Sequence, residues 1–289
     1  MEGNLSSLYE VDVYYSESDD SLQHENHYHY SHELIYIVEG NTDFVISGIQ
    51  YTVAENTLVI ISNLEPHANI VRSGAPYKRY VLLLPHPFCM MMIREPLLLS
   101  ILIHRPKDFS HVIRLDSKLT EKIHSLFELI IEEFNAKKAF WNVRCATIIV
   151  DMLLSIYRER SDAFPNYTNS ENIGDIVKIQ EFIALHIESP ITLDNLAKRF
   201  YISKYHLSRM FKAITGFCFK EYLILYRLNE AKNLLISTEI SVTVISQMIG
   251  YRDVNHFIRI FCQRERITPL QYRNKETRER CTVAMIKKE

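Results

Sequence analysis

Short apolar runs separated by turn residues fill the first part of the chain, from about Leu8 to Leu84. Apolar and polar residues alternate within these runs, which lie at 34–38, 43–46, 50–53, 57–61 and 79–84. Residues typical of turns separate them, at 39–41, 47–48, 54–56 and 63–66. Several short strands at near-regular spacing are typical of a small β-barrel or sandwich, so we expect one here.

After Pro85 the pattern becomes helical, and segments 119–136 and 139–160 each carry an apolar stripe at helical spacing. A polar stretch over 161–172 contains Pro165 and is typical of a linker, and a helix over 173–188 is predicted to end before Pro190. We therefore predict an N-terminal domain over 1–160, a linker over 161–172 and a C-terminal domain over 173–289. The two apolar stripes fit either a dimer surface or packing on their own barrel.

The C-terminal part contains a repeat with a spacing of about 50 residues. Arg209 and Arg259 are 50 positions apart, as are Phe211 and Phe261. Each copy, at about 192–212 and 241–262, has the pattern of a short helix, a tight turn and a second helix. Two tandem helix-turn-helix units can place two reading helices on one DNA duplex.

Helix-capping and turn residues support both copies. Thr192 and Ser203 are expected N-caps in the first copy, and Asp253 is an expected N-cap in the second. Gly250 suits the left-handed or strained backbone of the second turn. Phe257 and Phe261 are expected to anchor the second reading helix.

Polar and cationic side chains are predicted on the exposed faces of the two reading helices. Arg and Asn are suited to bidentate contact with guanine and adenine edges. An ordinary solvated helix face is the alternative interpretation, but two copies with matching Arg positions favour DNA reading. The predicted DNA-binding residues are Lys204, Tyr205, Ser208, Arg209, Lys212, Val254, Asn255, His256 and Arg259.

The near-neutral net charge of −2 hides an uneven distribution. Residues 170–289 hold 19 Lys and Arg against 13 Asp and Glu, whereas residues 1–169 hold 14 against 22. A basic C-terminal part would neutralise DNA phosphates and give an affinity that falls with salt.

The C-terminal segment resembles the DNA-binding domain of AraC/XylS-type transcriptional regulators over roughly residues 175–275. Matching stretches include Arg209-Met210-Phe211-Lys212, Gly250-Tyr251, Phe257-x-Arg259-x-Phe261 and Thr268-Pro269. The resemblance implies a joining helix at about Phe219 to Leu235. It also implies base-reading positions at Tyr205, Ser208, Arg209, Val254, Asn255 and Arg259.

The chain departs from the family pattern at two positions. Arg266 stands where the family usually has Gly at a helix C-terminus, and Phe219 stands where the first unit often has Pro. A left-handed conformation at Arg266 would cost on the order of 1 kcal/mol.

A constellation in the predicted barrel resembles the first cupin motif: His27-x-His29-x3-Glu33-x6-Gly40, with a later His67 after Pro66. Residues 27, 29 and 33 are all odd, so they would share one face of a continuous strand. In metal cupins two His, one Glu and a later His bind a divalent ion. The second motif is incomplete here, because Glu55-Asn56 replaces its usual Gly.

We expect these residues to recognise a small polar effector, such as a sugar, rather than to hold a metal or catalyse a reaction. A site of this kind needs a few placed polar groups on an apolar wall. The candidate effector-binding residues are His27, His29, Glu33, Tyr36, His67, Arg79 and Tyr80. A metal site at His27, His29, Glu33 and His67 is the less favoured interpretation, and no cofactor is expected.

The remaining features exclude several functional classes. The five cysteines, including Cys281, form no Cys-x-x-Cys pair and fit reduced thiols in the cytoplasm. The N-terminus does not have the pattern of a signal peptide, and no apolar run reaches the length of a membrane span. No glycine-rich phosphate loop or nucleophile motif occurs.

These observations predict an α+β multidomain protein. A cupin-like β-barrel with two following helices would precede an all-α domain with two helix-turn-helix units. We expect an effector-responsive, sequence-specific transcriptional regulator, more often an activator, which binds double-stranded DNA as a homodimer and contacts RNA polymerase. The alternatives are a metal-dependent cupin enzyme fused to a DNA-binding domain, and a regulator controlled by a protein partner.

Overall fold

The computed structural model describes residues 11–18, 27–71, 76–106, 108–165 and 170–275, and Cys281 lies outside them. The chain divides into two compact units whose main boundary follows Val177. This position lies inside helix α5 (Ser170–Leu185), whereas the predicted linker covers 161–172.

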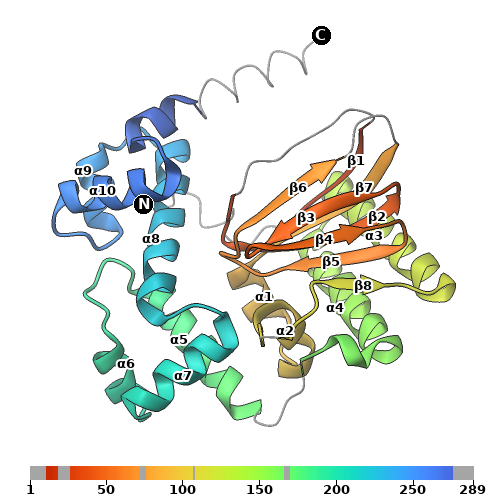
Figure 1. Ribbon diagram of the computed structural model, residues 1–289, viewed down its shortest axis with the longest axis horizontal. Coiled ribbons are helices and arrows are strands. Elements are labelled where there is room, and N and C mark those ends of the chain that lie inside the picture. The colour runs from red at the N-terminus through yellow and green to blue at the C-terminus, as the bar shows by residue number, and fades with distance from the viewer. Residues whose placement is uncertain (1–10, 19–26, 72–75, 107, 166–169, 276–289) are drawn as a thin grey trace. The chain divides into compact units, whose positions relative to one another are not determined.

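Two antiparallel sheets form the N-terminal unit (Figure 1). The larger sheet has the order β1-β7-β2-β5-β8, with bounds Asp12–Ser18, Tyr77–Pro85, Ser31–Glu39, Thr57–Ile61 and Val112–Arg114. The smaller sheet has the order β4-β3-β6, with bounds Ile49–Val53, Thr42–Ile46 and His67–Val71. The expected β-domain is confirmed.

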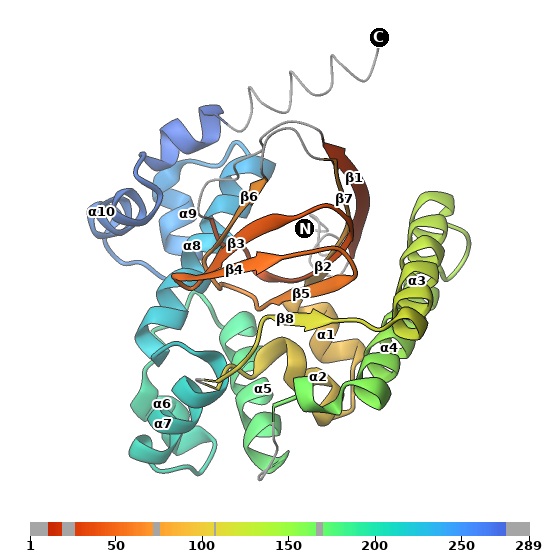
Figure 2. The same ribbon diagram turned by 45° about the vertical axis from the view of Figure 1, so that its right-hand side comes forward.

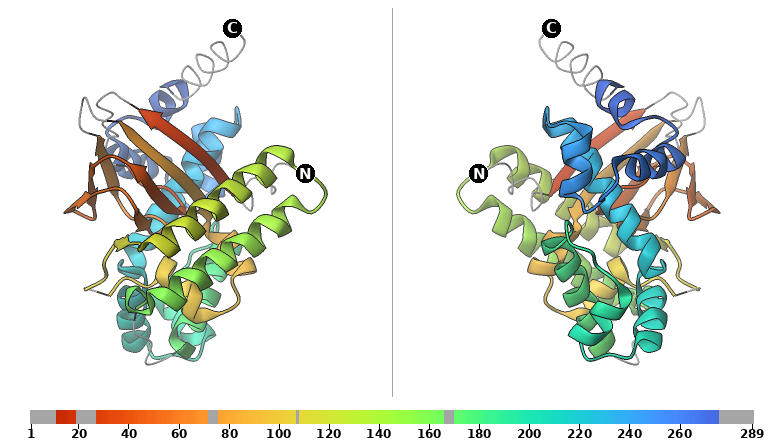
Figure 3. Two further views of the ribbon diagram at one scale, coloured as in Figure 1. Left: turned by 90° about the vertical axis from the view of Figure 1, so that its right-hand side faces the viewer. Right: turned by 90° about the vertical axis from the view of Figure 1, so that its left-hand side faces the viewer.

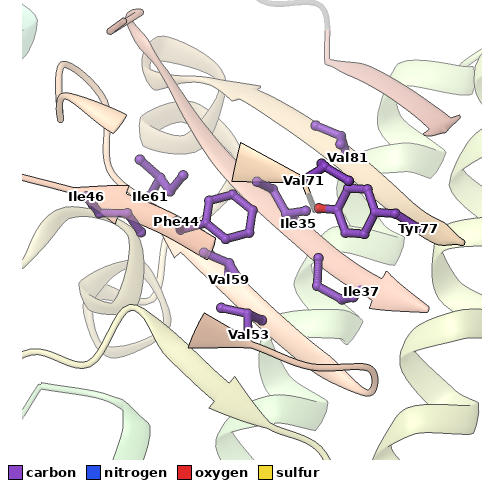
Figure 4. Close-up of a cluster of buried hydrophobic side chains, with 10 residues drawn as sticks. All are labelled: Ile35, Ile37, Phe44, Ile46, Val53, Val59, Ile61, Val71, Tyr77 and Val81. Atoms are coloured by element: carbon purple, nitrogen blue, oxygen red, sulfur yellow. The ribbon is translucent and has the colours of Figure 1, made fainter. Parts of the chain in front are cut away.

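Apolar side chains from both sheets meet in one core (Figure 4). Its members come from β2, β3, β4, β5, β6 and β7, and they are Ile35, Ile37, Phe44, Ile46, Val53, Val59, Ile61, Val71, Tyr77 and Val81. On β2 and β7 these are odd-numbered positions, because alternate side chains of a strand point to the same face. The inner face of β2 therefore carries Glu33, Ile35 and Ile37.

Helices cover the outer face of the larger sheet. Helices α3 (Ser117–Ala136) and α4 (Trp141–Glu159) run side by side as a hairpin (Figures 2 and 3). Their apolar stripes are buried, including Ile123 and Phe127 on α3 and Ile149 on α4. The stripes thus pack largely within their own unit. Two short helices that the sequence pattern did not resolve, α1 (His86–Met92) and α2 (Pro96–Ile103), precede β8.

Left-handed backbone conformations occur at specific turns. Ser47 and Gly48, with φ angles of 51° and 82°, form the two-residue turn between β3 and β4. Positive φ at both central residues matches the twist of a hairpin. Asn56, in the Glu55-Asn56 pair that replaces the usual cupin Gly, has a φ of 57°. Asn is among the residues that adopt this conformation most readily.

The C-terminal part contains α5, α6 (Leu193–Arg199), α7 (Lys204–Thr215), α8 (Phe219–Ser237), α9 (Val242–Met248) and α10 (Val254–Glu265). Helix α8 joins the α6–α7 pair to the α9–α10 pair (Figures 1 and 3). Leu228, Ala231 and Leu235 of α8 pack with Ile245 of α9 and Phe257 of α10. The two helix-turn-helix units and the joining helix are therefore present as predicted. None of the described helices is long and apolar enough to cross a membrane.

Candidate DNA-binding surface and effector site

Two N-caps define where the helices of the first helix-turn-helix unit begin. The Thr192 hydroxyl accepts a hydrogen bond from the Asn195 amide at 3.2 Å and starts α6, and the Ser203 hydroxyl accepts one from the His206 amide at 3.3 Å and starts α7. Each cap satisfies a backbone N–H that has no partner within its own helix. Leu207 and Phe211 are fully buried, so the opposite face of α7 is exposed.

In the second helix-turn-helix unit, the turn between α9 and α10 is tightly packed. Gly250 has a φ of 84°, and a Cβ at this position would collide with the Ile187 carbonyl oxygen and the Arg227 guanidinium. Arg227 in turn donates hydrogen bonds to the Ile187 and Ser189 carbonyls at 3.0 and 2.9 Å. A carboxylate oxygen of Asp253 accepts from the Asn255 amide at 2.8 Å and starts α10. Glycine is thus required by packing as well as by conformation.

The structure places most of the predicted DNA-binding side chains on exposed faces of α7 and α10. Tyr205 is 82% exposed, and the other members of the α7 set are also exposed. On α10 Val254 is half-buried, whereas the remaining three residues of the predicted set are exposed. The exposed residues are Lys204, Tyr205, Ser208, Arg209, Lys212, Asn255, His256 and Arg259.

Lys204 has a partner within its own unit that the sequence pattern did not indicate. Its ammonium group lies 2.8 Å from a carboxylate oxygen of Asp194 on α6, and this contact raises the pKa of Lys204. The pair is exposed, so its charges are screened by water. To contact a DNA phosphate, the Lys204 ammonium group would have to leave its ion pair with Asp194.

In the N-terminal unit four residues of the cupin-like constellation converge. His27 and His67 exchange two backbone hydrogen bonds, with N···O distances of 3.0 and 2.9 Å. The rings of His27 and His29 lie 4.3 and 5.1 Å from the His67 ring. Glu33 Oε2 lies 3.4 Å from His29 Nε2 and 3.1 Å from His67 Nε2. These residues do not share a continuous strand, because β2 begins at Ser31, but they still form one group.

Burial and neighbouring rings affect the ionisation of this group. Burial alone would raise the pKa of Glu33, but interactions with His29 and His67 outweigh it, and the carboxyl pKa falls well below its usual range. Burial alone would lower the pKa of His67, but interactions with Glu33 outweigh it and raise that pKa. Glu33 is thus an anion that attracts positive charge to this end of the domain.

The other three candidate effector residues do not join this group. Tyr36 and Tyr80 are stacked on Phe127 of α3, with ring centroids 6.0 and 5.3 Å away, so they lie on the outer face of the sheet. The prediction that they contribute to an internal site is wrong, because even-numbered positions of β2 and β7 point away from the core. Arg79 does point inward, but it pairs with Ile37 and not with Glu33.

Arg79 belongs to a second polar group that the sequence pattern did not indicate. Glu33 pairs with Leu83, four residues along β7 from Arg79, or about 13 Å at 3.3 Å per residue. Near Arg79 the Tyr77 hydroxyl accepts a hydrogen bond from the Asn69 amide at 3.2 Å, and Thr42 donates to the Asn69 side-chain oxygen. The Arg79 guanidinium lies 5.4 Å from the Tyr77 ring centroid. In the sequence, only the odd numbers of Tyr77 and Arg79 indicated that both side chains lie on the inner face of β7.

Comparison with known families covers most of the chain. Residues 10–140 match the AraC-like ligand binding domain, and residues 196–275 match a helix-turn-helix domain family. The chain belongs to the AraC family of transcriptional regulators. In this AraC-family chain the ligand-binding match includes His27, His29, Glu33 and His67, and the helix-turn-helix match includes both α7 and α10.

Curated relatives align with part of this AraC-family chain. An uncharacterised HTH-type transcriptional regulator, YtdP of Bacillus subtilis, is 36% identical over 128 residues, which are 44% of this chain and 16% of that protein. The HTH-type transcriptional activator RhaR of Escherichia coli is 32% identical over 123 residues, 43% of each chain. The lactose operon transcription activator of Staphylococcus xylosus is 34% identical over 100 residues, 35% of this chain and 36% of that one. The chain thus matches less than half the length of these relatives.

A solved structure shares the fold over nearly the whole length. ToxT from Vibrio cholerae, in a crystal structure with bound unsaturated fatty acid, covers 91% of this chain and 94% of its own, with a TM-score of 0.59 and 13% identity. At this identity the similarity shows the fold alone. The order of a β-domain followed by a helical domain is therefore shared with a solved structure over 91% of this chain.

Proposed function

We propose that the protein is an effector-responsive activator of transcription that reads two DNA segments with α7 and α10. The observation that carries this proposal is the presence of two helix-turn-helix units with exposed Arg209 and Arg259 at matching positions. Arg is suited to bidentate contact with guanine, and Asn255 is suited to adenine. RhaR and the lactose operon regulator are both named activators, which favours activation over repression.

The effector is proposed to bind in the N-terminal unit at the His–Glu group, defined as His27, His29, Glu33 and His67. Three imidazoles and one carboxylate at the end of an apolar core offer both donors and acceptors to a small polar molecule. Binding can change DNA affinity only if the effector prefers one of two states of the regulator. A small polar metabolite, such as a sugar, fits these groups.

A homodimer is the proposed assembly, because paired half-sites are read by paired proteins. Most of the apolar stripes of α3 and α4 are already buried within the unit. Leu129, Phe140 and Val143 of this hairpin region remain exposed, and Phe140 is 79% exposed. They are the proposed contact between protomers. We place the protein in the cytoplasm with RNA polymerase as a partner.

The first test is capture of genomic fragments on the purified full-length protein, followed by sequencing. Enrichment of a few intergenic sites with half-sites about one helical turn apart is the expected result. Binding without sequence preference that salt removes entirely would contradict base reading.

The second test compares two variants on the captured site. Arg209→Ala should cost roughly 1–3 kcal/mol of binding free energy and relax one base preference. Lys204→Ala is the matched control from the same helix, and it should weaken binding to all sequences alike. Equal losses on all DNA for Arg209→Ala would refute its role in base reading.

A further inference from the structure

Tyr201 adopts a left-handed backbone conformation in the turn of the first helix-turn-helix unit, with a φ angle of 56°. The Ile202 amide donates a hydrogen bond to the Ala197 carbonyl at 2.9 Å, and the Tyr201 amide donates one to the Lys198 carbonyl at 3.4 Å. These two bonds form a Schellman motif at the end of α6, and the left-handed residue of that motif is usually glycine. A residue with a Cβ atom is disfavoured there, so the backbone at Tyr201 is strained.

The second unit ends its first helix in the same way. The Tyr251 amide donates to the Ser246 carbonyl at 2.8 Å, and the Gly250 amide donates to the Gln247 carbonyl at 2.9 Å. With its φ angle of 84°, Gly250 occupies the position in the second unit that Tyr201 occupies in the first. The same helix ending thus forms with glycine, and the turn itself does not require tyrosine.

Packing within the protein does not compensate for the strained backbone at Tyr201. The residue is 98% exposed, so almost none of its ring is in contact with the rest of the chain. Strained backbone conformations are concentrated at functional sites, where a side chain is needed for its interaction with a partner. An exposed tyrosine offers such a partner a hydroxyl donor on a rigid ring.

A surface hollow at this turn combines the tyrosine with basic residues. It is lined by Asn195, Lys198, Arg199, Phe200 and Tyr201. Two of these residues are cations and none is an acid. Lys198 and Arg199 are both exposed, so their charges are accessible to an anionic partner. Two cations beside a tyrosine hydroxyl suit the phosphates of DNA, which are contacted by Lys, Arg and Tyr side chains.

The position of the turn favours the DNA backbone over the base edges. In a helix-turn-helix unit the second helix enters the major groove with its N-terminal residues on the bases, and the first helix crosses the backbone. The turn joins these two helices, so it lies where the groove meets the backbone. Helix α7 begins at Lys204, three residues after Tyr201. Tyr201 therefore extends the DNA-reading surface of α7 toward the phosphates.

We propose that the Tyr201 hydroxyl donates a hydrogen bond to a phosphate at the edge of the groove that α7 enters, and that Lys198 neutralises charge on the same strand. A contact of this kind carries no sequence information, but it fixes the position of the reading helix on the duplex. The proposal rests on the proposed function, in which α7 reads DNA. It adds a positioning residue that is absent from the predicted DNA-binding set.

Two substitutions separate the hydroxyl from the backbone strain. Tyr201→Phe keeps the strain and removes only the hydroxyl. It should weaken DNA binding about tenfold, as expected for one hydrogen bond to a charged acceptor, and leave the melting temperature unchanged. Tyr201→Gly also relieves the strain, so it should weaken binding by at least the same factor while hydrogen exchange in α6 and α7 slows about fivefold. A purely structural residue would not lower affinity while raising stability.

Binding is measured with the full-length protein on a captured genomic fragment and on a random-sequence duplex at low salt. The loss in Tyr201→Phe should be equal on both, because every sequence presents phosphates. Lys198→Ala should reduce the slope of log affinity against log salt concentration by about one. Tyr15→Phe, which removes an exposed hydroxyl of β1, is the matched control and should bind like the wild type.

The two duplexes keep failure of this proposal distinct from failure of the proposed function. If the wild type shows no preference for the captured fragment, base reading fails, but the phosphate contact is still measured on the random duplex. Wild-type affinity of Tyr201→Phe on both duplexes would overturn the phosphate contact, as would a loss confined to one sequence. Unchanged DNA affinity with reduced transcription by RNA polymerase in vitro would also overturn it, because Tyr201 would then contact the polymerase. Faster hydrogen exchange in Tyr201→Gly would contradict the argument from strain.

Discussion

Gly250→Ala should destabilise the C-terminal unit far more than an ordinary Gly→Ala change at a left-handed position. The φ angle of 84° alone costs an L-residue roughly 1–2 kcal/mol. In addition, the new Cβ would collide with the Ile187 carbonyl oxygen, which is backbone and cannot rotate away. It would also displace the Arg227 guanidinium from the Ile187 and Ser189 carbonyls, and a hydrogen bond to a charged group contributes about 1.5–3 kcal/mol. We therefore expect a total loss of about 3–5 kcal/mol.

Gly48→Ala is the control that separates conformation from packing. Gly48 has a nearly equal φ of 82°, but a Cβ at this position would meet no atom within 4 Å. Only the conformational cost of roughly 1–2 kcal/mol therefore applies. Hydrogen exchange measured by mass spectrometry reports the local unfolding free energies of α9–α10 and of the sheets in the same full-length protein. Circular dichroism melting gives the global effect.

Equal losses of free energy in the two alanine variants, to within about 0.5 kcal/mol, would show that packing at Gly250 adds nothing. Weaker protection in the sheets with α9–α10 unchanged would contradict the placement of the effect in the C-terminal unit. The double variant Gly250→Ala/Arg227→Ala adds a check on mechanism. Its total loss should be smaller than the sum of the single losses, because both changes remove the same hydrogen bonds.

Three further predictions concern single side chains. Arg266 ends α10 with a φ of 64°, so Arg266→Gly should raise the free energy of unfolding in urea by about 1 kcal/mol. The control Gln263→Gly, within the same helix, should lower it by a similar amount. Asp253→Ala removes the cap of α10 and should cost about 1 kcal/mol, and Asp253→Asn should restore most of it; equal stability of all three proteins would contradict the cap. Burial alone would raise the pKa of Glu65, but Arg105, His111 and the Ser62 amide together outweigh it and hold the pKa at about 2, below the ordinary 4.5. The ionised Glu65 therefore contributes on the order of 3 kcal/mol to the free energy of unfolding above pH 4.5, and this contribution is lost as the pH falls toward 2. The difference in unfolding free energy between the wild type and Glu65→Gln, measured by chemical denaturation, should disappear over that pH range.

The helices of the C-terminal part of this protein could be predicted from the amino-acid sequence. Thr192, Ser203 and Asp253 were identifiable as caps because each acts on an amide two or three residues away. The helix end at Arg266 was indicated only by the family resemblance, which has Gly at this position, and Arg266 does adopt a left-handed conformation there with a φ of 64°. Helix periodicity and capping depend on neighbours within one or two turns, so the linear pattern contains the required information.

Which side chains of the β-domain share a site became clear only from the folded chain. Residues 32–37 of β2 are all buried, because the barrel core covers one face and α3 covers the other. Without alternation between buried and exposed positions, the pattern could not assign Tyr36 to the outer face and Glu33 to the inner one. Convergence of His67 with His27 depends on a backbone pairing between segments 40 residues apart in the sequence. Such pairings are set by packing of the whole sheet, which no local pattern encodes.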